Sequence, residues 1–158
     1  MLYRTNPRNG DQLSQLGFGC MRLPGDFSEA RRQIVRAIEL GVNYFDTAYI
    51  YPNNEATLGR ALADGYRDRV KIATKLPPYL VRRYEDFDRI LEAQLARLRT
   101  DSIDYYLAHM LSDVNGWDRI ATLGFADWVA EKKSRGQIRN IGFSYHGGRA
   151  EFPRILDA

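Results

Sequence analysis

Short apolar runs alternate five times with longer amphipathic segments along this chain of 158 residues. The runs have the length of buried strands, and the segments between them carry apolar residues at helical spacing. Repeated strand and helix units predict a parallel β/α architecture, because neighbouring parallel strands need a crossover connection. The strands are expected at residues 16–21, 42–45, 70–74, 103–108 and 138–143, and the main helices at about 26–41, 54–65, 87–98 and 117–135, the last broken near Gly124.

The N-terminal residues have a different pattern. Residues 2–5 and 11–16 flank Asn9-Gly10, a strong signal for a hairpin turn. We expect a β-hairpin over about residues 1–16, followed by β/α units over about 16–158, together forming one partial barrel domain.

Two parallel architectures are compatible with this order, an open doubly wound sheet and a (β/α)8 TIM barrel. The open sheet binds nucleotide at a G-x-G-x-x-G turn, and the segment Gly17–Arg22 lacks the third glycine. Asp46, Lys75 and His109 follow three successive strands, as active-site residues of barrels do. A complete barrel takes about 250 residues. We therefore expect an α/β fold, present as an incomplete barrel of about five units.

Four side chains at these strand ends form a chemically coherent set: Asp46, Tyr51, Lys75 and His109. Taken singly, each has a structural explanation, such as packing for the tyrosine or a surface position for the lysine. Together they suit delivery of a proton to a carbonyl oxygen. A free phenol has a pKa of about 10, which a neighbouring lysine cation lowers. A carboxylate would keep a buried lysine charged, and a histidine would donate a hydrogen bond to the substrate oxygen.

Four separated motifs resemble those of the aldo/keto reductase family: Asp46-Thr47-Ala48-x-x-Tyr51, Ala73-Thr74-Lys75, Asp104-x-x-Leu107-x-His109 and Ile141-Gly142-Phe143-Ser144. The resemblance extends from about Leu13 to the end of the chain. It implies a TIM barrel in which Tyr51 is the general acid, Lys75 adjusts its pKa, Asp46 pairs with the lysine and His109 orients the substrate.

The resemblance also implies a cofactor, NADP(H) or possibly NAD(H). Its nicotinamide half would face strand-end residues: Gly19, Met21, Arg22, Asp46 and Ser144. The family often has Asn after this serine, whereas Tyr145 stands there in this chain. The motifs are most similar to a bacterial branch that often carries a C-terminal 4Fe-4S ferredoxin-like segment. Cys20 is the only cysteine, so an iron–sulfur cluster is expected only if a segment beyond residue 158 exists. A small buried residue is the favoured interpretation of Cys20 over a redox thiol.

These observations predict an NAD(P)H-dependent oxidoreductase that reduces an aldehyde or ketone to an alcohol. The alternative is a non-catalytic nucleotide-binding or protein-interaction barrel segment, or an inactive fragment of such an enzyme. Two histidines and one cysteine are a poor metal-ligand set, so no metal is expected.

The expected partner is a small-molecule carbonyl compound. The net charge of +3 is scattered, which argues against nucleic acid, and no apolar run approaches the roughly 20 residues that span a membrane. A single cysteine and the absence of a signal-peptide pattern predict a cytoplasmic protein. The unpaired edges of the strands at 16–21 and 138–143 would allow association.

Overall fold

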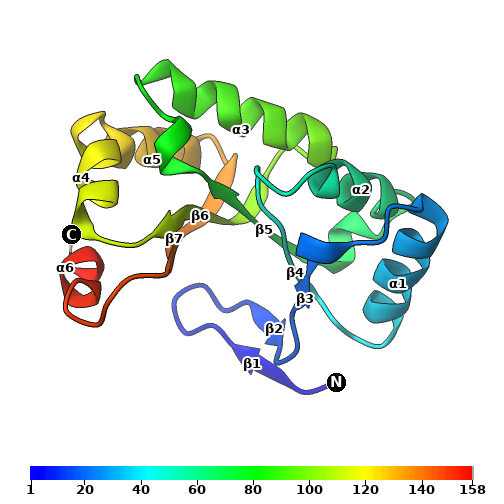
Figure 1. The fold of residues 1–158 in the computed structure, drawn as a ribbon. Coiled ribbons are helices and arrows are strands. Elements are labelled where there is room, and N and C mark those ends of the chain that lie inside the picture. The colour runs from blue at the N-terminus through cyan, green and yellow to red at the C-terminus, as the bar shows by residue number, and fades with distance from the viewer. Residues whose placement is uncertain (158) are drawn as a thin grey trace.

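The computed structural model describes residues 1–157. It contains a five-stranded parallel sheet with the strand order β3-β4-β5-β6-β7 and a two-stranded antiparallel sheet, β1-β2 (Figure 1). The strands are β1 (Tyr3–Thr5), β2 (Gln12–Ser14), β3 (Phe18–Gly19), β4 (Tyr44–Asp46), β5 (Lys71–Leu76), β6 (Ile103–Leu111) and β7 (Ile138–Tyr145). The α-helices are α1 (Phe27–Glu39), α2 (Asn54–Ala61), α3 (Glu85–Leu98), α4 (Val114–Thr122), α5 (Phe125–Ser134) and α6 (Phe152–Leu156). Three short 3-10 helices are η1 (Cys20–Arg22), η2 (Arg67–Arg69) and η3 (Pro78–Leu80).

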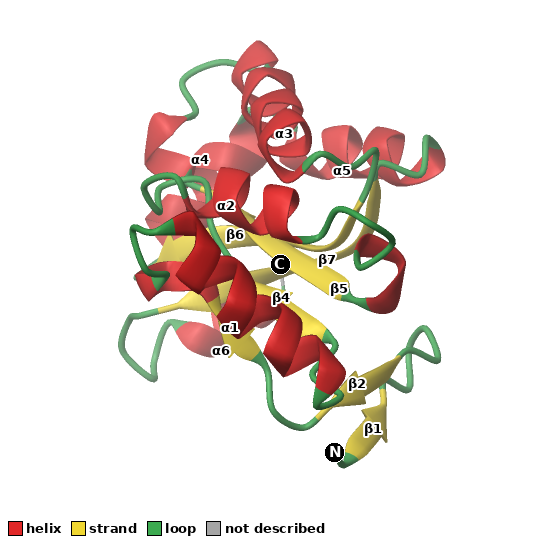
Figure 2. Ribbon diagram, turned by 90° about the vertical axis from the view of Figure 1, so that its right-hand side faces the viewer, coloured by secondary structure: helices red, strands yellow, loops and turns green. Residues whose placement is uncertain are grey.

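The five strands lie side by side in chain order, and helices α1 to α5 follow them in an arc on the outside (Figure 1). This is the arrangement of consecutive β/α units in a barrel, and it is that of an incomplete barrel, because β3 and β7 do not pair with each other within residues 1–157. The secondary structure seen from the side shows the same separation of strands and helices (Figure 2). The predicted architecture is therefore confirmed.

The main core lies between the sheet and this layer of helices. Helix α1 begins at a cap in which Asp26 Oδ1 accepts a hydrogen bond from the backbone N–H of Glu29 at 2.8 Å. It then buries a stripe formed by Ala30, Ile34 and Ile38. Under α3 and α5, Phe87, Phe125 and Trp128 pack with ring centroids 5.3 to 5.8 Å apart. These contacts fix the helices against the strands that carry the polar residues.

The first strand of the parallel sheet is much shorter than the predicted 16–21. β3 pairs only with β4, through Phe18 opposite Phe45 and Gly19 opposite Asp46. The chain then turns into η1 at Cys20. Within the described residues, β3 has a neighbouring strand on one side only. Extending it would therefore add few backbone hydrogen bonds, and the chain turns instead.

Two other boundaries differ for identifiable reasons. The helix expected at 54–65 ends at Ala61, because Asp64 and Gly65 have positive φ angles of 61° and 85°. The helix expected from 117 already starts at Val114, because Asp113 Oδ1 accepts a hydrogen bond from Gly116 N at 3.0 Å. The predicted break at Gly124 is present, with φ 87°.

An ionic cluster closes the N-terminal end of the sheet. Asp104, 1% exposed, accepts hydrogen bonds from Arg67 Nη2 at 2.9 Å and from the backbone N–H of Ile72 at 3.0 Å. Asp11, in the hairpin loop, pairs with Lys71 Nζ at 3.0 Å. Here a single carboxylate holds β5, β6 and η2 together, and the hairpin packs over the same end.

Candidate active site

A buried ion pair joins the C-terminal ends of β4 and β5. Lys75 Nζ donates to Asp46 Oδ1 at 2.5 Å and to the carbonyl oxygen of Thr47 at 2.8 Å. The lysine side chain is 6% exposed and the aspartate side chain 35%. The register of the parallel pair, with Asp46 opposite Ala73, brings the lysine two positions further along to the end of β4. A desolvated cation needs such a partner, so the predicted pairing of the two residues has a physical basis.

Tyr51 lies on a loop that runs along β5 beyond the end of β4. Backbone hydrogen bonds from Thr47 N to Ala73 O at 2.8 Å and from Tyr49 N to Lys75 O at 3.4 Å hold the loop there. As a result, Lys75 Nζ is 5.3 Å from the centroid of the half-buried Tyr51 ring. The phenol therefore lies beside the ammonium group.

His109 approaches from the next strand. It is not the last residue of β6, as the sequence suggests, but sits in a β-bulge. The pairing shifts between Ala108 and Leu111, and Met110 has φ 55°. The bulge turns the histidine toward Tyr51, with ring centroids 5.9 Å apart and an interplanar angle of 82°. Four side chains predicted from the sequence thus meet at one end of the sheet.

The histidine is neutral at physiological pH. Burial, together with the nearby Lys75 and His146, lowers the pKa of His109 from 6.5 to about 4. Its Nδ1 is buried and has no hydrogen-bond partner within the part of the chain that the structure describes. The other nitrogen, Nε2, is therefore the one available to a substrate.

The pKa of Tyr51 differs from the sequence-based expectation. We expected Lys75 to lower it, but it is raised, first by burial of the phenol and then by the negative charge of Asp46. Lys75 Nζ is in short contact with Asp46 Oδ1, so the opposite charges of this pair offset each other at the phenol. Tyr51 is consequently fully protonated at neutral pH.

Residues expected at the cofactor surround the same end of the sheet. Gly19 ends β3, and a side chain added there would meet nothing within 4 Å. Met21 and Arg22 follow it in η1 and are exposed. Ser144 Oγ, near the end of β7, accepts a hydrogen bond from Met110 N at 2.8 Å, which leaves its own O–H free to donate. The open space beside Gly19 and the hydroxyl donor of Ser144 are compatible with the carboxamide group of a nicotinamide.

Two neighbours do not contribute to that set. The hydroxyl of Tyr145 donates to the carbonyl oxygen of Gly148 at 2.6 Å, so it is engaged within its own loop. Cys20 is fully buried, and burial, with a contribution from Asp46, raises the pKa of its thiol to about 12. A thiol with that pKa is protonated and unreactive, which agrees with the interpretation as a packing residue.

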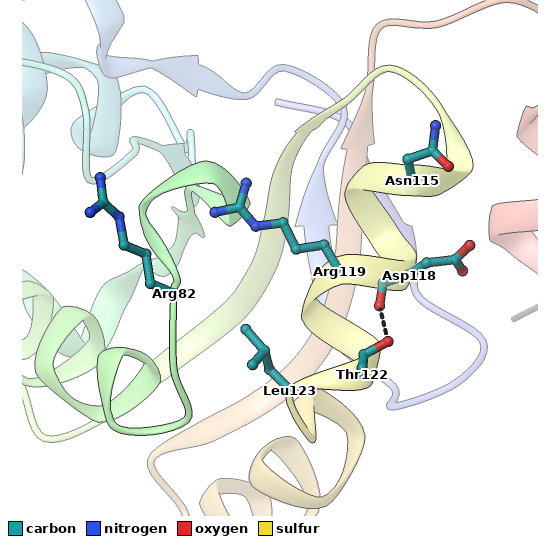
Figure 3. Close-up of a pocket in the computed structure, with 6 residues that line it drawn as sticks. All are labelled: Arg82, Asn115, Asp118, Arg119, Thr122 and Leu123. Carbon is teal, nitrogen blue, oxygen red and sulfur yellow. Dashed lines mark hydrogen bonds between the residues drawn. The ribbon is translucent and has the colours of Figure 1, made fainter.

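A surface hollow lies elsewhere. It measures about 560 Å³ and is formed by residues beside η3 and on α4: Arg82, Asn115, Asp118, Arg119, Thr122 and Leu123 (Figure 3). Arg119 Nη2 donates to the carbonyl oxygen of Val81 at 3.1 Å. None of the four clustered residues lines this hollow, and we assign it no role in their chemistry.

The sequence model of the aldo/keto reductase family matches residues 15–151. The chain belongs to this family. A "probable aldo-keto reductase 1" of Glycine max is 29% identical over 154 residues, with 85% of this chain and 42% of the relative covered. An "uncharacterized oxidoreductase YqkF" of Bacillus subtilis (strain 168) is 33% identical over 147 residues, with 84% and 45% covered. The chain thus spans less than half the length of these curated relatives.

Solved structures of aldo-keto reductases are also similar to this chain. The holo form of the aldo-keto reductase AKR11C1 from Bacillus halodurans is 31% identical and has a TM-score of 0.78, with 92% of this chain and 50% of that chain covered. A putative aldo-keto reductase from Pseudomonas aeruginosa is 29% identical and has a TM-score of 0.82, with 99% and 64% covered. The five units of this chain therefore correspond to part of an aldo-keto reductase barrel.

Sequence reasoning missed one polar group next to the site. Glu55, at the start of α2, is 1% exposed and contacts Thr74, Gln94 and Arg97. The available signal was Gln94, a polar residue within the apolar stripe of α3. Among residues 1–157, no cluster of His, Cys, Asp and Glu side chains is arranged to hold a metal ion, and no helix is long and apolar enough to cross a membrane.

Proposed function

We propose that these residues are the catalytic centre of an NAD(P)H-dependent oxidoreductase that reduces an aldehyde or ketone to an alcohol. The observation that carries the proposal is the convergence of Asp46, Tyr51, Lys75 and His109 at one end of the sheet, with the phenol 5.3 Å from the lysine Nζ. Family membership supports the same reaction class. The substrate is a small carbonyl compound.

Tyr51 is the proton donor. A phenol with an ordinary pKa of about 10 already carries its proton at neutral pH, so the proton is available. Because burial and Asp46 raise the pKa of Tyr51, loss of that proton to the substrate has to be assisted. As the proton leaves for the carbonyl oxygen, the phenolate that forms is stabilised by the ammonium group of Lys75. Asp46 and the carbonyl oxygen of Thr47 hold that ammonium group in place.

His109 orients the substrate. A neutral imidazole with a buried Nδ1 presents Nε2 to the same oxygen that accepts the proton from Tyr51. With a pKa of about 4, the histidine acts as a hydrogen-bonding group and not as a competing acid. The division of roles between the two rings follows from their opposite pKa shifts.

The cofactor, NADP(H) or NAD(H), supplies a hydride to the carbonyl carbon when bound. Gly19 would leave room for the nicotinamide beside the end of β3; Asp46 is its partner in β4, and Met21 and Arg22 follow it in η1. The O–H of Ser144, whose oxygen accepts from Met110 N, would donate to the carboxamide oxygen of a bound nicotinamide. Tyr145 stands where the family often has Asn, and its hydroxyl is hydrogen-bonded to the carbonyl oxygen of Gly148, so it would not supply a second contact to the carboxamide.

Tyr51→Phe in the full-length protein tests the proposal. The change removes the proton donor and leaves the ring in place, so turnover of a reactive aldehyde should fall by roughly 10²- to 10⁴-fold. NADPH affinity, measured by fluorescence titration, should stay within twofold, because the phenol contributes to the transition state and not to cofactor binding.

Tyr44→Phe is the matched control. Tyr44 lies on β4, and burial raises the pKa of its phenol, yet it is not among the four clustered residues. This variant should retain normal turnover. Retention of turnover within tenfold by Tyr51→Phe would remove Tyr51 from the mechanism. Cofactor binding without any turnover by the unmodified protein would favour the non-catalytic alternative.

A further inference from the structure

A buried polar network lies behind the candidate site, between β5 and helices α2 and α3. Glu55, in the first turn of α2, is 1% exposed. Its Oε1 accepts hydrogen bonds from Thr74 Oγ1 at 2.6 Å and from Gln94 Nε2 at 2.9 Å. Gln94 Oε1 in turn accepts one from the hydroxyl of Tyr106 at 2.7 Å. Burying a carboxylate is costly, so the contacts it makes there require an explanation.

The network contacts β5 at Thr74 and Lys75, next to the ammonium group of the candidate site. Successive side chains of a strand point to opposite faces, so Thr74 faces the helices while Lys75 faces Asp46. Gln94 Nε2 also donates to the carbonyl oxygen of Lys75 at 3.2 Å. Both the side chain before the lysine and the lysine's own backbone are therefore tied to α3.

The same network holds the loop that carries Tyr51. Arg97 Nη1 donates to Glu55 Oε2 at 3.1 Å and to the carbonyl oxygen of Tyr49 at 3.4 Å. The guanidinium carbon lies 4.6 Å from the centroid of the Tyr49 ring. Tyr51 thus lies between two anchored positions, one two residues before it and one four residues after it.

We propose that Glu55 is a positioning residue for the proton-transfer step, setting the place of Tyr51 relative to Lys75 through Thr74, Gln94 and Arg97. The inference rests on the proposed function, since it names what holds the proton donor in that reaction. Glu55 is not bonded to Asp46, Tyr51, Lys75 or His109, so it acts through the loop and the strand.

Two variants with opposite charge changes separate positioning from electrostatics. Glu55→Gln removes a negative charge and the contact to Arg97 but keeps an oxygen toward Thr74. Arg97→Met removes a positive charge from a side chain that is 41% exposed and leaves the buried Glu55 with its donors Thr74 and Gln94. Because this takes a charged partner from a buried carboxylate, urea unfolding of the variant is measured beside its turnover. A through-space charge effect would change turnover in opposite directions in the two variants. Loss of positioning should lower kcat in both.

We expect both variants to lower kcat by about tenfold with NADPH affinity within twofold of wild type. A readout independent of turnover is hydrogen–deuterium exchange of residues 47–53. The amides of Tyr49 and Tyr51, which donate to Lys75 O and Ala48 O, should exchange faster in both variants. Exchange in β7, which carries no member of this network, should not change because the effect is local.

Asp104→Asn is the control for general destabilisation. Asp104 is 1% exposed like Glu55 and is also paired with arginine, but it lies at the opposite end of the sheet. It should lower stability while leaving kcat and exchange of residues 47–53 within twofold of wild type. Opposite changes in kcat, unchanged exchange of residues 47–53, or equal acceleration in β7 would each overturn the proposal.

The two hypotheses fail separately. If the wild-type protein reduces no carbonyl compound, the proposed function fails, and exchange of residues 47–53 in Glu55→Gln and Arg97→Met still decides whether Glu55 anchors the loop. If the wild-type protein turns over but these variants match it in kcat and exchange, the function stands and the positioning role is refuted.

Discussion

Neutralising Asp46 should affect both the stability of the protein and the acidity of its proton donor. In Asp46→Asn the side chain keeps an oxygen that can accept from Lys75 Nζ, and the second bond, to the carbonyl oxygen of Thr47, is unaffected. What is lost is the negative charge opposite a lysine side chain that is only 6% exposed. The variant therefore isolates the charge from the shape of the pair.

The size of the loss follows from burial. Breaking a fully buried ion pair costs about 3–5 kcal/mol, whereas an exposed pair contributes about 0–1 kcal/mol. The Asp46 side chain is 35% exposed, so water reaches it, while Lys75 is nearly fully covered. With one hydrogen bond preserved, we expect the free energy of unfolding to fall by about 2 kcal/mol.

The same change should lower the pKa of Tyr51. After burial, the charge of Asp46 is the main cause of the raised pKa of this phenol, because a negative neighbour disfavours phenolate. Removing that charge makes phenolate easier to form. The alkaline limb of the pH–rate profile should therefore move to lower pH, and turnover should decrease because Lys75 is held less firmly.

Urea unfolding and steady-state rates test the prediction, with Asp88→Asn as the matched control. Asp88 Oδ1 pairs at 2.7 Å with Lys132 Nζ, and the two side chains are 42% and 6% exposed, close to the values of the first pair. The control should lose comparable stability without any change in turnover. An ordinary surface substitution changes the free energy of unfolding by about 0.5 kcal/mol or less. If Asp46→Asn stays within that range of wild type, burial of the pair is refuted.

Three further outcomes are expected. Lys75→Met should reduce turnover at least about a hundredfold and raise the pKa of Tyr51 further, measured by a pH–rate profile; an unshifted profile would contradict the contact. Folded His109, with a pKa of about 4, binds its proton less readily than the unfolded form at 6.5, so stability is full above pH 6.5 and falls toward pH 4. In urea titrations, His109→Gln should make the free energy of unfolding depend less on pH between 6.5 and 4. An unchanged dependence would show that another group causes it. The 158-residue chain made alone should associate through its sheet edges, and Ile141→Lys on β7, at a residue 40% exposed, should reduce light scattering.

The order of strands and helices was predictable because hydrophobic period and turn residues are local properties. Gly124 marks the break between α4 and α5 with φ 87°, and the apolar stripe of α3 is buried as its spacing predicts. The length of β3 was not predictable in the same way. Whether a strand continues depends on a partner on each side, and that partner is remote in sequence.

The residues of the candidate site were predictable as a set, but the pKa of Tyr51 was not. The sequence places Asp46 and Lys75 at neighbouring strand ends. It does not show whether the lysine cation interacts more strongly with the carboxylate of Asp46 or with the phenol of Tyr51. The structure shows that the lysine is bound to the carboxylate, with Nζ 2.5 Å from Asp46 Oδ1, and that the charge of Asp46 also raises the pKa of the phenol. The position of His109 likewise depends on a bulge that no local pattern marks.

Glu55 shows where local patterns stop being informative. A glutamate near the start of a helix is expected on the surface, where it favours the helix dipole and needs no partner. Its buried carboxylate is stabilised by donors that are remote in sequence: Thr74 and Arg97, and Gln94, which lies 39 residues later within the apolar face of α3. Neither Glu55 nor Gln94 is unusual alone, and their meeting depends on how α2 and α3 pack over β5. If that packing sets the geometry of proton transfer, loss of turnover in Glu55→Gln should be matched by Gln94→Leu, which removes the shared donor while filling the same space.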